Sequence, residues 1–339
     1  MRLVNLSRRK AGTDRRTVGF VVALLIVEIA IVAATVPGFA SAGNVTNVLL
    51  EFAPLGFVAL GEMLVMLSGG LDISVGSTVS LTTVLLATWV HGGGWAAMGG
   101  ISAVMGVAAA IGLANGILIG LIGFGPFIVT LATLSIVEGA ALQAAGQGAP
   151  SIPAVIANFG YGQVWLLPYP FIAFLVVSIV MSYLLSHRPW GLHLYAVGGS
   201  EQNAALSGLR PARMKLVVYA VCGLFAGVGG IMLAGATGGA DPLIGQNYAL
   251  NAITAVVLGG VSLLGGRGNL LGVCGAVGII TVLGNALDLS SVSGELQLLI
   301  VGGMLLVAVG LYGRRLGGSN WWDRWVRRDM ASVTAGDGC

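Results

Sequence analysis

The chain is built from ten apolar runs, most of them about twenty residues long and almost free of charge. A helix of about 20 apolar residues spans the hydrocarbon core of a bilayer. Because lipid offers no partner to an unpaired backbone N–H or C=O group, runs of this kind fold as helices and not as open sheets. We therefore expect an all-α fold, a polytopic membrane bundle of about ten transmembrane helices.

Composition supports this expectation. Charged residues make up 9% of the chain, against about 25% in a soluble domain, and the mean hydropathy is +0.94. We divide the chain into a basic N-terminal segment (1–17), a transmembrane domain (18–313) and a C-terminal tail (314–339). The expected spans are 18–36, 45–67, 71–91, 96–122, 126–146, 164–186, 214–236, 247–264, 270–288 and 296–313.

The sixteen Lys and Arg residues all fall on one side of this ten-span arrangement. They occupy both termini and the loop 187–213, among other places, whereas the loops of the opposite side contain none. Because Lys and Arg concentrate in cytoplasmic loops, we predict a multi-pass protein of the cytoplasmic (inner) membrane with both termini in the cytoplasm. The net charge of +3 requires no nucleic-acid partner. Trp321, Trp322 and Trp325 lie among arginines in the tail, a pattern typical of an anchor in the lipid headgroups.

The first apolar run has a second interpretation, as a signal peptide. It follows a basic start, and Ala40-Ser41-Ala42 resembles a cleavage site. Its apolar part is longer than that of a signal peptide, so we favour an uncleaved span. Cleavage would leave the orientation of the other spans unchanged.

Several sequence patterns of catalysis are absent from the chain. Neither lysine follows a glycine, so there is no Walker A loop for ATP. HExxH, GxSxG and C-x-x-C patterns are also missing. We expect no catalytic residue, metal or cofactor, and any ATP hydrolysis must come from a separate subunit.

The loop 187–213 contains a short helix with clear start and stop signals. Ser200 is a good N-cap, and Glu201 follows in the first turn, where the helix dipole favours an acid. Gly208 can adopt the left-handed conformation after the helix, and Pro211 prevents its continuation. We expect a break at Gly198-Gly199 and helix over 202–207.

A helix this short is not stable alone. It either lies on the protein's own surface or docks against a soluble partner. The candidate docking segment comprises Gly198, Gly199, Ser200, Glu201, Gln202, Asn203, Ala204, Ala205, Leu206, Ser207 and Gly208.

The stretch "GGLDISVGS" (69–77) places an aspartate between two apolar runs. We expect the glycine pair to end the second span and Asp72 to cap the third, by accepting hydrogen bonds from backbone N–H groups near Ser74 or Val75. The predicted topology puts the motif at the membrane boundary, where a carboxylate costs less than the ~2.5–3.5 kcal/mol of the bilayer centre. A hinge in a broken helix is the alternative to a purely structural cap. The motif residues are Gly69, Gly70, Asp72, Ser74 and Gly76.

Four motifs in this order resemble one known family. They are "GGLDISVGS" (69–77), Asn115-Gly116 followed by "PFIVTLATL" (126–134), "YAVGGSEQNAALSG" (195–208) and "YALNAITAVVLGGVSLLGGRG" (248–268). Together they are similar to the permease subunits of ribose-type ABC sugar importers, over about residues 40–313. The chain departs at Ser200, where the family commonly has Asn, and at Asn203 and Ala205, where Ala and Arg are frequent. The block 259–268 also has a pattern like that of 69–77, which leaves internal duplication and coincidence both open.

The resemblance implies import of a monosaccharide or related polyol. The implied partners are an ABC ATP-binding subunit, a second permease subunit in a homo- or heterodimer, and an extracytoplasmic sugar-binding protein. The short helix in 187–213 would be the coupling helix to the ATPase. The alternatives are an ion- or proton-coupled secondary transporter, which the acids Glu28, Glu51, Glu62 and Glu138 would serve without any intramembrane base, and a membrane-anchored receptor. The sequence does not name the sugar.

A sugar pathway needs polar groups that match hydroxyls and still release the cargo. Polar residues in or near the spans are candidates, although each also suits a helix–helix hydrogen bond. The candidates are Asn115, Thr130, Thr133, Gln143, Asn247, Tyr248, Asn251 and Asn285. The outer loops carry acids and no base, which indicates either ordinary solvation or docking of a binding protein that presents Lys or Arg. These acids are Asp241, Asp288 and Glu295.

Overall fold

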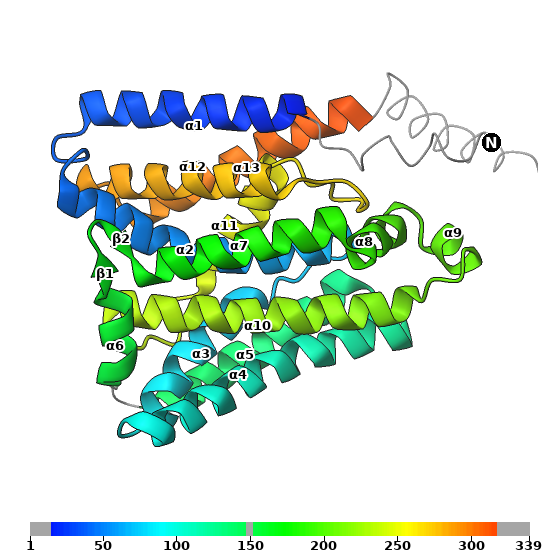
Figure 1. Ribbon diagram of the computed structural model, residues 1–339, viewed down its shortest axis with the longest axis horizontal. Coiled ribbons are helices and arrows are strands. Elements are labelled where there is room, and N and C mark those ends of the chain that lie inside the picture. The colour runs from blue at the N-terminus through cyan, green and yellow to red at the C-terminus, as the bar shows by residue number, and fades with distance from the viewer. Residues whose placement is uncertain (1–14, 147–151, 317–339) are drawn as a thin grey trace, which may run out of the picture.

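The computed structural model describes residues 15–146 and 152–316, and it is an all-α membrane bundle, as predicted. Most of its helices lie side by side along one long axis (Figure 1). The ten helices that match the ten predicted spans are α1 (Arg15–Thr35), α2 (Ala42–Leu67), α3 (Val75–Trp89), α4 (Gly94–Gly116), α5 (Pro126–Ala145), α7 (Tyr169–His187), α10 (Pro211–Thr237), α11 (Gln246–Leu258), α12 (Leu270–Leu289) and α13 (Gly294–Leu316).

Seven of the described helices are long and apolar enough to cross a membrane. The other three are shorter in their apolar part: α3 has 15 residues, α11 has 13, and α13 is apolar over Gly294–Gly310. The predicted spans 71–91 and 247–264 are therefore wrong at one end each, because α3 begins only at Val75 and α11 already ends at Leu258. In both places a non-helical segment rich in glycine replaces part of the expected helix.

The remaining elements lie at the two ends of the bundle, which we call the α6 end and the α9 end (Figure 1). The α6 end carries α6 (Ala154–Tyr161) and a small hairpin, β1 (Gln163–Val164) with β2 (Leu167–Pro168). Because this hairpin occupies residues 163–168, the helix predicted over 164–186 begins only at Tyr169. The α9 end carries α8 (Pro189–Gly199) and α9 (Glu201–Leu206), and the π-helical segment η1 (Ile117–Ile122) extends α4.

Both ends of the described chain lie at the α9 end of the bundle (Figure 1). The basic residues Arg188, Arg210 and Arg213 flank α8 and α9, and Arg16 starts α1. The one-sided placement of positive charge predicted from sequence therefore agrees with the alternating course of the helices. That this side is cytoplasmic stays a prediction from the positive-inside rule. The segment 1–14 and the tail 317–339, with its tryptophans, lie outside the described residues.

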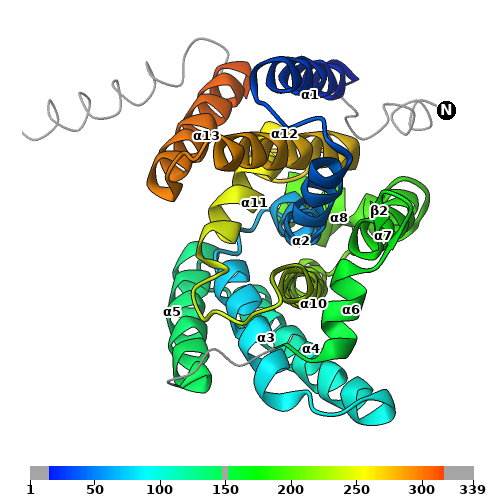
Figure 2. The same ribbon diagram turned by 90° about the vertical axis from the view of Figure 1, so that its left-hand side faces the viewer.

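The helices α2 and α10 lie at the centre of the bundle (Figure 2). The packing of α10 against α4 depends on glycine. A Cβ atom added at Gly112 would overlap the carbonyl oxygen of Tyr219, and one added at Gly223 would overlap the carbonyl oxygen of Ala108. Small residues allow such close backbone approach, which matters in lipid because apolar side chains gain little there by leaving the solvent.

We expect the substitution Gly112→Ala to destabilise the bundle by about 1–3 kcal/mol, because the new methyl group meets backbone that cannot rotate away. Gly106→Ala in the same helix is the matched control, since nothing lies within 4 Å of its Cβ position. Thermal unfolding of the two purified variants in detergent measures the difference. Equal transition temperatures would contradict this account of the α4–α10 contact.

Candidate functional site

The second span ends in a left-handed turn. Gly69 has a φ of 83°, and its N–H donates to the carbonyl of Met66 at 3.0 Å. The N–H of Gly70 donates to the carbonyl of Val65, also at 3.0 Å. This pair of bonds is a Schellman cap, which satisfies carbonyl groups left free at the end of a helix. As predicted, the glycine pair ends the span, and the chain returns toward the core without helical structure until α3 begins.

Asp72 lies in this non-helical segment and is 1% exposed. Its Oδ1 accepts hydrogen bonds from the Ser74 backbone N–H at 3.0 Å and from the Ser74 hydroxyl at 2.5 Å. The predicted acceptance from Ser74 is confirmed, but one detail of the prediction is wrong, because Ser74 itself occupies the N-cap position of α3. Asp72 is enclosed by protein, and its place at the membrane boundary stays a prediction.

Asn115, at the end of α4, completes the environment of the carboxylate. Its Nδ2 donates to the Ser74 hydroxyl at 2.9 Å and lies 3.5 Å from both oxygens of Asp72. The hydroxyl of Thr133 on α5 in turn donates to Asn115 Oδ1 at 2.6 Å. These side chains join the segment before α3 to two neighbouring helices, which is the helix–helix role that the sequence left open for Asn115 and Thr133.

Two further residues belong to the same cluster and were not assigned to it from sequence. The Asp72 backbone N–H donates to Glu62 Oε1 at 3.2 Å, and Glu62 is fully buried. The Tyr219 hydroxyl donates to the Leu71 carbonyl at 3.2 Å and accepts from the Leu71 N–H at 3.3 Å. Glu62 was noted only as an intramembrane acid. Tyr219 lies in an apolar run, and nothing in its sequence neighbourhood indicates a contact 148 residues away.

The second glycine-rich block, after α11, repeats the geometry of the first. Gly260 has a φ of 93°, its N–H donates to Val257 at 3.0 Å, and the N–H of Val261 donates to Val256 at 3.1 Å. These are the bonds of the same Schellman cap. The same pair of bonds also ends α9 and α12, so the shared cap does not distinguish internal duplication from coincidence, and both explanations stay open.

The two blocks meet the end of α8 at a point that we call the glycine junction, formed by Gly69, Gly198, Gly265 and Gly266. The N–H of Gly266 donates to the Leu67 carbonyl, the last of α2, at 3.0 Å. A Cβ atom at Gly198 would overlap that same carbonyl and lie 2.6 Å from the Gly266 nitrogen. The end of α8 therefore rests directly on the backbone of the last residue of α2 and of the non-helical segment between α11 and α12.

Tyr195 adds a side-chain bond to this contact. Its hydroxyl donates to the Gly268 carbonyl at 3.2 Å. Burial raises the pKa of Tyr195 above its usual value, so the hydroxyl remains a donor at neutral pH. Helix α8 is thus tied to the segment between α11 and α12 at two places.

The predicted short helix is present as α9. The side chain of Ser200 accepts from the Asn203 N–H at 3.3 Å, and Gly208 has a φ of 82°, so both predicted signals are confirmed. The helix covers Glu201–Leu206, slightly earlier than expected. Gly198 and Gly199 do not break the chain but form the last turn of α8, because the turn into α9 falls at Ser200.

Helix α9 has a single buried residue, Ala204, and Leu206 is 87% exposed. Its tie to the bundle is an ion pair of Glu201 with Lys215 at 2.6 Å. Because Glu201 is half exposed, such a pair contributes only about 0–1 kcal/mol. Little of its own protein holds this helix, and most of its surface is available to a partner.

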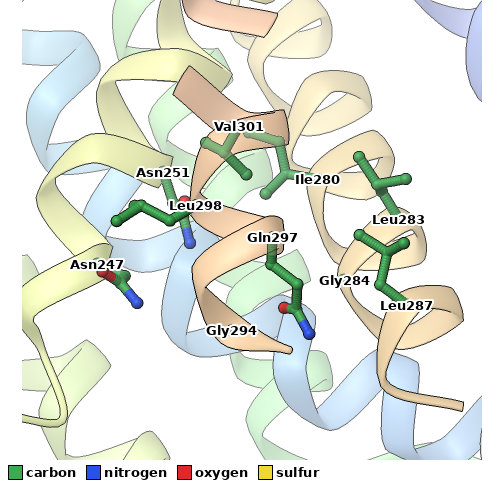
Figure 3. A pocket seen from close by; sticks show the side chains of 10 residues that line it. All are labelled: Asn247, Asn251, Ile280, Leu283, Gly284, Leu287, Gly294, Gln297, Leu298 and Val301. Atoms are coloured by element: carbon green, nitrogen blue, oxygen red, sulfur yellow. The ribbon is translucent and has the colours of Figure 1, made fainter. Parts of the chain in front are cut away.

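The other candidate pathway residues do not form one site. Asn247 and Asn251 of α11 line a pocket together with Gln297 of α13 (Figure 3). Four candidates lie outside the lining. Asn285 binds Asn44 at 2.8 Å, Thr130 binds the Pro126 carbonyl, Gln143 is exposed on α5, and Tyr248 packs against the core.

The three acids considered for docking all lie at the α6 end of the bundle. Asp241 lies in the turn before α11 and Glu295 in the first turn of α13, whereas Asp288 lies in the last turn of α12 and not in a loop as predicted. Asp241 accepts from the Leu243 N–H at 2.8 Å, and Asp288 accepts from Gln297 at 2.6 Å. Glu295 is exposed, and a hydrogen bond from Ser293 lowers its pKa below the usual range, so it is charged at neutral pH.

The fold and the site define the class of the protein. It is a membrane protein with several spans, in which a non-helical segment with a buried carboxylate interrupts the helices in the core and a weakly held short helix lies at one end. The chain belongs to the family described as the permease component of branched-chain amino acid transport systems, which matches residues 44–309. It is 38% identical to the ribose import permease protein RbsC of Bacillus subtilis over 290 residues, covering 84% of this chain and 89% of that protein.

Other relatives extend the comparison. The ribose import permease protein RbsC of Escherichia coli is 34% identical over 291 residues, 84% of this chain and 90% of that protein. The D-allose transport system permease protein AlsC of the same species is 29% identical over 80% of this chain and 84% of that protein. No solved structure gave a significant match.

We expect Asp72→Ala to lower the stability of the bundle by at least about 2 kcal/mol, because it leaves the donors of Ser74 and Asn115 buried without an acceptor. Asp72→Asn should cost less, since its amide oxygen still accepts. Asp241→Ala, which removes an exposed carboxylate, is the control. The measurements are the amount of monodisperse protein after purification and its unfolding temperature. If Asp72→Ala leaves both unchanged, the Asp72 carboxylate does not stabilise this cluster.

Proposed function

We propose that the chain is the transmembrane permease subunit of an ABC importer that moves a monosaccharide or related polyol across the cytoplasmic membrane. A separate ATP-binding subunit supplies the energy. The observation that carries this proposal is helix α9, which is almost unsupported by its own protein and lies at the end rich in basic residues. The chain has no Walker A loop, and relatives named for ribose and allose support the sugar class.

Helix α9 is the coupling helix in this proposal. A movement of α9 passes to α8, which directly precedes it, and from Gly198 to the Leu67 carbonyl at the end of α2 and to Gly266 at the glycine junction. The non-helical segments that follow α2 and α11 lead into α3 and α12. The geometry thus offers a short route from the ATPase to the core.

A second permease subunit, identical or related, covers the face formed by α5, α11 and α13. This face carries polar groups within the membrane region, including Asn247 and the bond of Gln246 to Glu138 at 3.1 Å. Polar side chains at this depth face protein or a water-filled pathway and not lipid. We place the sugar pathway here, next to the pocket of Asn251 and Gln297.

An extracytoplasmic sugar-binding protein docks at the α6 end, where Asp241, Asp288 and Glu295 would meet its Lys or Arg residues. The competing function is an ion- or proton-coupled secondary transporter. It is disfavoured because the intramembrane acids are scattered and no intramembrane base joins them into a proton relay, and because Glu138 is bonded to Gln246. The relationship to import permeases also favours the ABC importer.

The direct test is uptake in proteoliposomes that contain the chain with its cognate ATP-binding subunit. Labelled ribose and the binding protein are supplied outside and ATP inside. We expect uptake that requires ATP and is unaffected by an uncoupler, with an ATPase-inactive subunit as control. Uptake that persists without ATP and collapses with the uncoupler would establish the secondary transporter instead.

The coupling route makes a sharper prediction for neighbouring glycines. Gly198→Ala forces the new Cβ into the Leu67 carbonyl, whereas Gly199→Ala meets nothing within 4 Å. Such an overlap costs about 1–3 kcal/mol, so Gly198→Ala should uncouple ATP hydrolysis from uptake. Gly199→Ala should preserve both. The measurement is the ratio of ribose taken up to ATP hydrolysed, and equal ratios in the two variants would contradict the route.

A further inference from the structure

The carboxyl of Glu62 is satisfied at only one of its two oxygens. Oε1 accepts the Asp72 backbone N–H at 3.2 Å, but Oε2 is buried and has no hydrogen-bond partner. The residue as a whole has 0% exposure. A buried carboxylate oxygen without a donor is costly, because ionised groups lose several kcal/mol of hydration when they enter the protein interior.

The surroundings of Glu62 supply no positive charge. Asp72 faces it from the segment before α3, and Tyr219 and Cys222 face it from α10. None of these groups is basic, and within residues 15–146 and 152–316 neither carboxyl forms an ion pair. Two negative charges together at this depth would repel each other as well as lose hydration.

The two carboxyls differ in their donors. Asp72 accepts from the backbone and hydroxyl of Ser74, with the Asn115 amide nearby, and these donors stabilise a negative charge. Glu62 accepts from a single backbone N–H. A neutral carboxylic acid fits that pattern better than a carboxylate, because its carbonyl oxygen accepts the one donor, and burying its hydroxyl without an acceptor costs less than burying a second ionised oxygen.

We propose that Glu62 is a proton-binding site in which Oε2 carries the proton and Oε1 accepts the Asp72 N–H, while Asp72 holds the single negative charge of the cluster. The bound proton keeps the non-helical segment against α2. Its loss would place a second charge beside Asp72 and separate that segment from α2. This inference does not depend on what the protein transports.

Infrared spectroscopy of the purified full-length protein tests the assignment directly. We expect the difference spectrum between wild type and Glu62→Gln to show loss of the C=O stretch of a protonated carboxylic acid. Glu201→Gln, which removes an exposed carboxylate, should instead remove carboxylate stretches. Asp72→Asn should also remove carboxylate stretches and leave the protonated band in place.

Stability gives a second measurement. Glutamine reproduces a neutral acid, so Glu62→Gln should accumulate to within about twofold of wild type, whereas Asp72→Asn should accumulate less because it loses charge-assisted hydrogen bonds. The proposal is overturned if Glu62→Gln removes carboxylate bands, if Asp72→Asn removes the protonated band, or if Glu62→Gln fails to accumulate while Asp72→Asn does. A Na⁺-dependent shift of the Glu62 carboxylate bands would replace the proton by a cation and would also overturn it.

Discussion

The structure depends on one constraint, that a carboxylate placed inside a membrane bundle must be met by donors. Asp72 meets this constraint because the chain is not helical around it. A non-helical backbone frees the N–H groups of Asp72 and Ser74, and the first reaches Glu62 while the second reaches Asp72 itself. Asn115 and Thr133 then extend the network to α4 and α5. The break in the helix and the buried acid therefore require each other.

Glycine has a different purpose at each place where backbones meet. Between α4 and α10 it allows two long helices to approach closely over their length. At Gly69 and Gly260 it supplies the left-handed conformation that ends a helix. At Gly198 and Gly266 it brings three segments, far apart in sequence, within reach of one carbonyl oxygen, that of Leu67. The high glycine content thus reflects contact geometry and not disorder.

The length and composition of the apolar runs predicted the all-α fold and most helix limits, because those depend on local composition. The cap at Ser200 was also local, and it was found. The features that the sequence did not predict depend on contacts between residues far apart in the chain. Glu62 and Tyr219 join Asp72 only through tertiary packing, and α8 includes Gly198 and Gly199 because the Leu67 and Gly266 backbones support them. The near-complete burial of Asp72 also depends on this packing, which brings Glu62 and Asn115 around it.

The strengths of the contacts differ in a way that suits transmission. Helix α9 has one ion pair, with a half-exposed Glu201, and one buried residue, so only weak contacts fix its position on the bundle. The glycine junction beneath it consists of backbone atoms in direct contact, which cannot absorb a displacement by rotating side chains. In the proposed coupling route, a displacement applied at α9 is therefore lost less readily at the junction than it would be between flexible side chains, and it reaches the non-helical segments that follow α2 and α11. These are the places where α3 and α12 lack continuous helix to resist it.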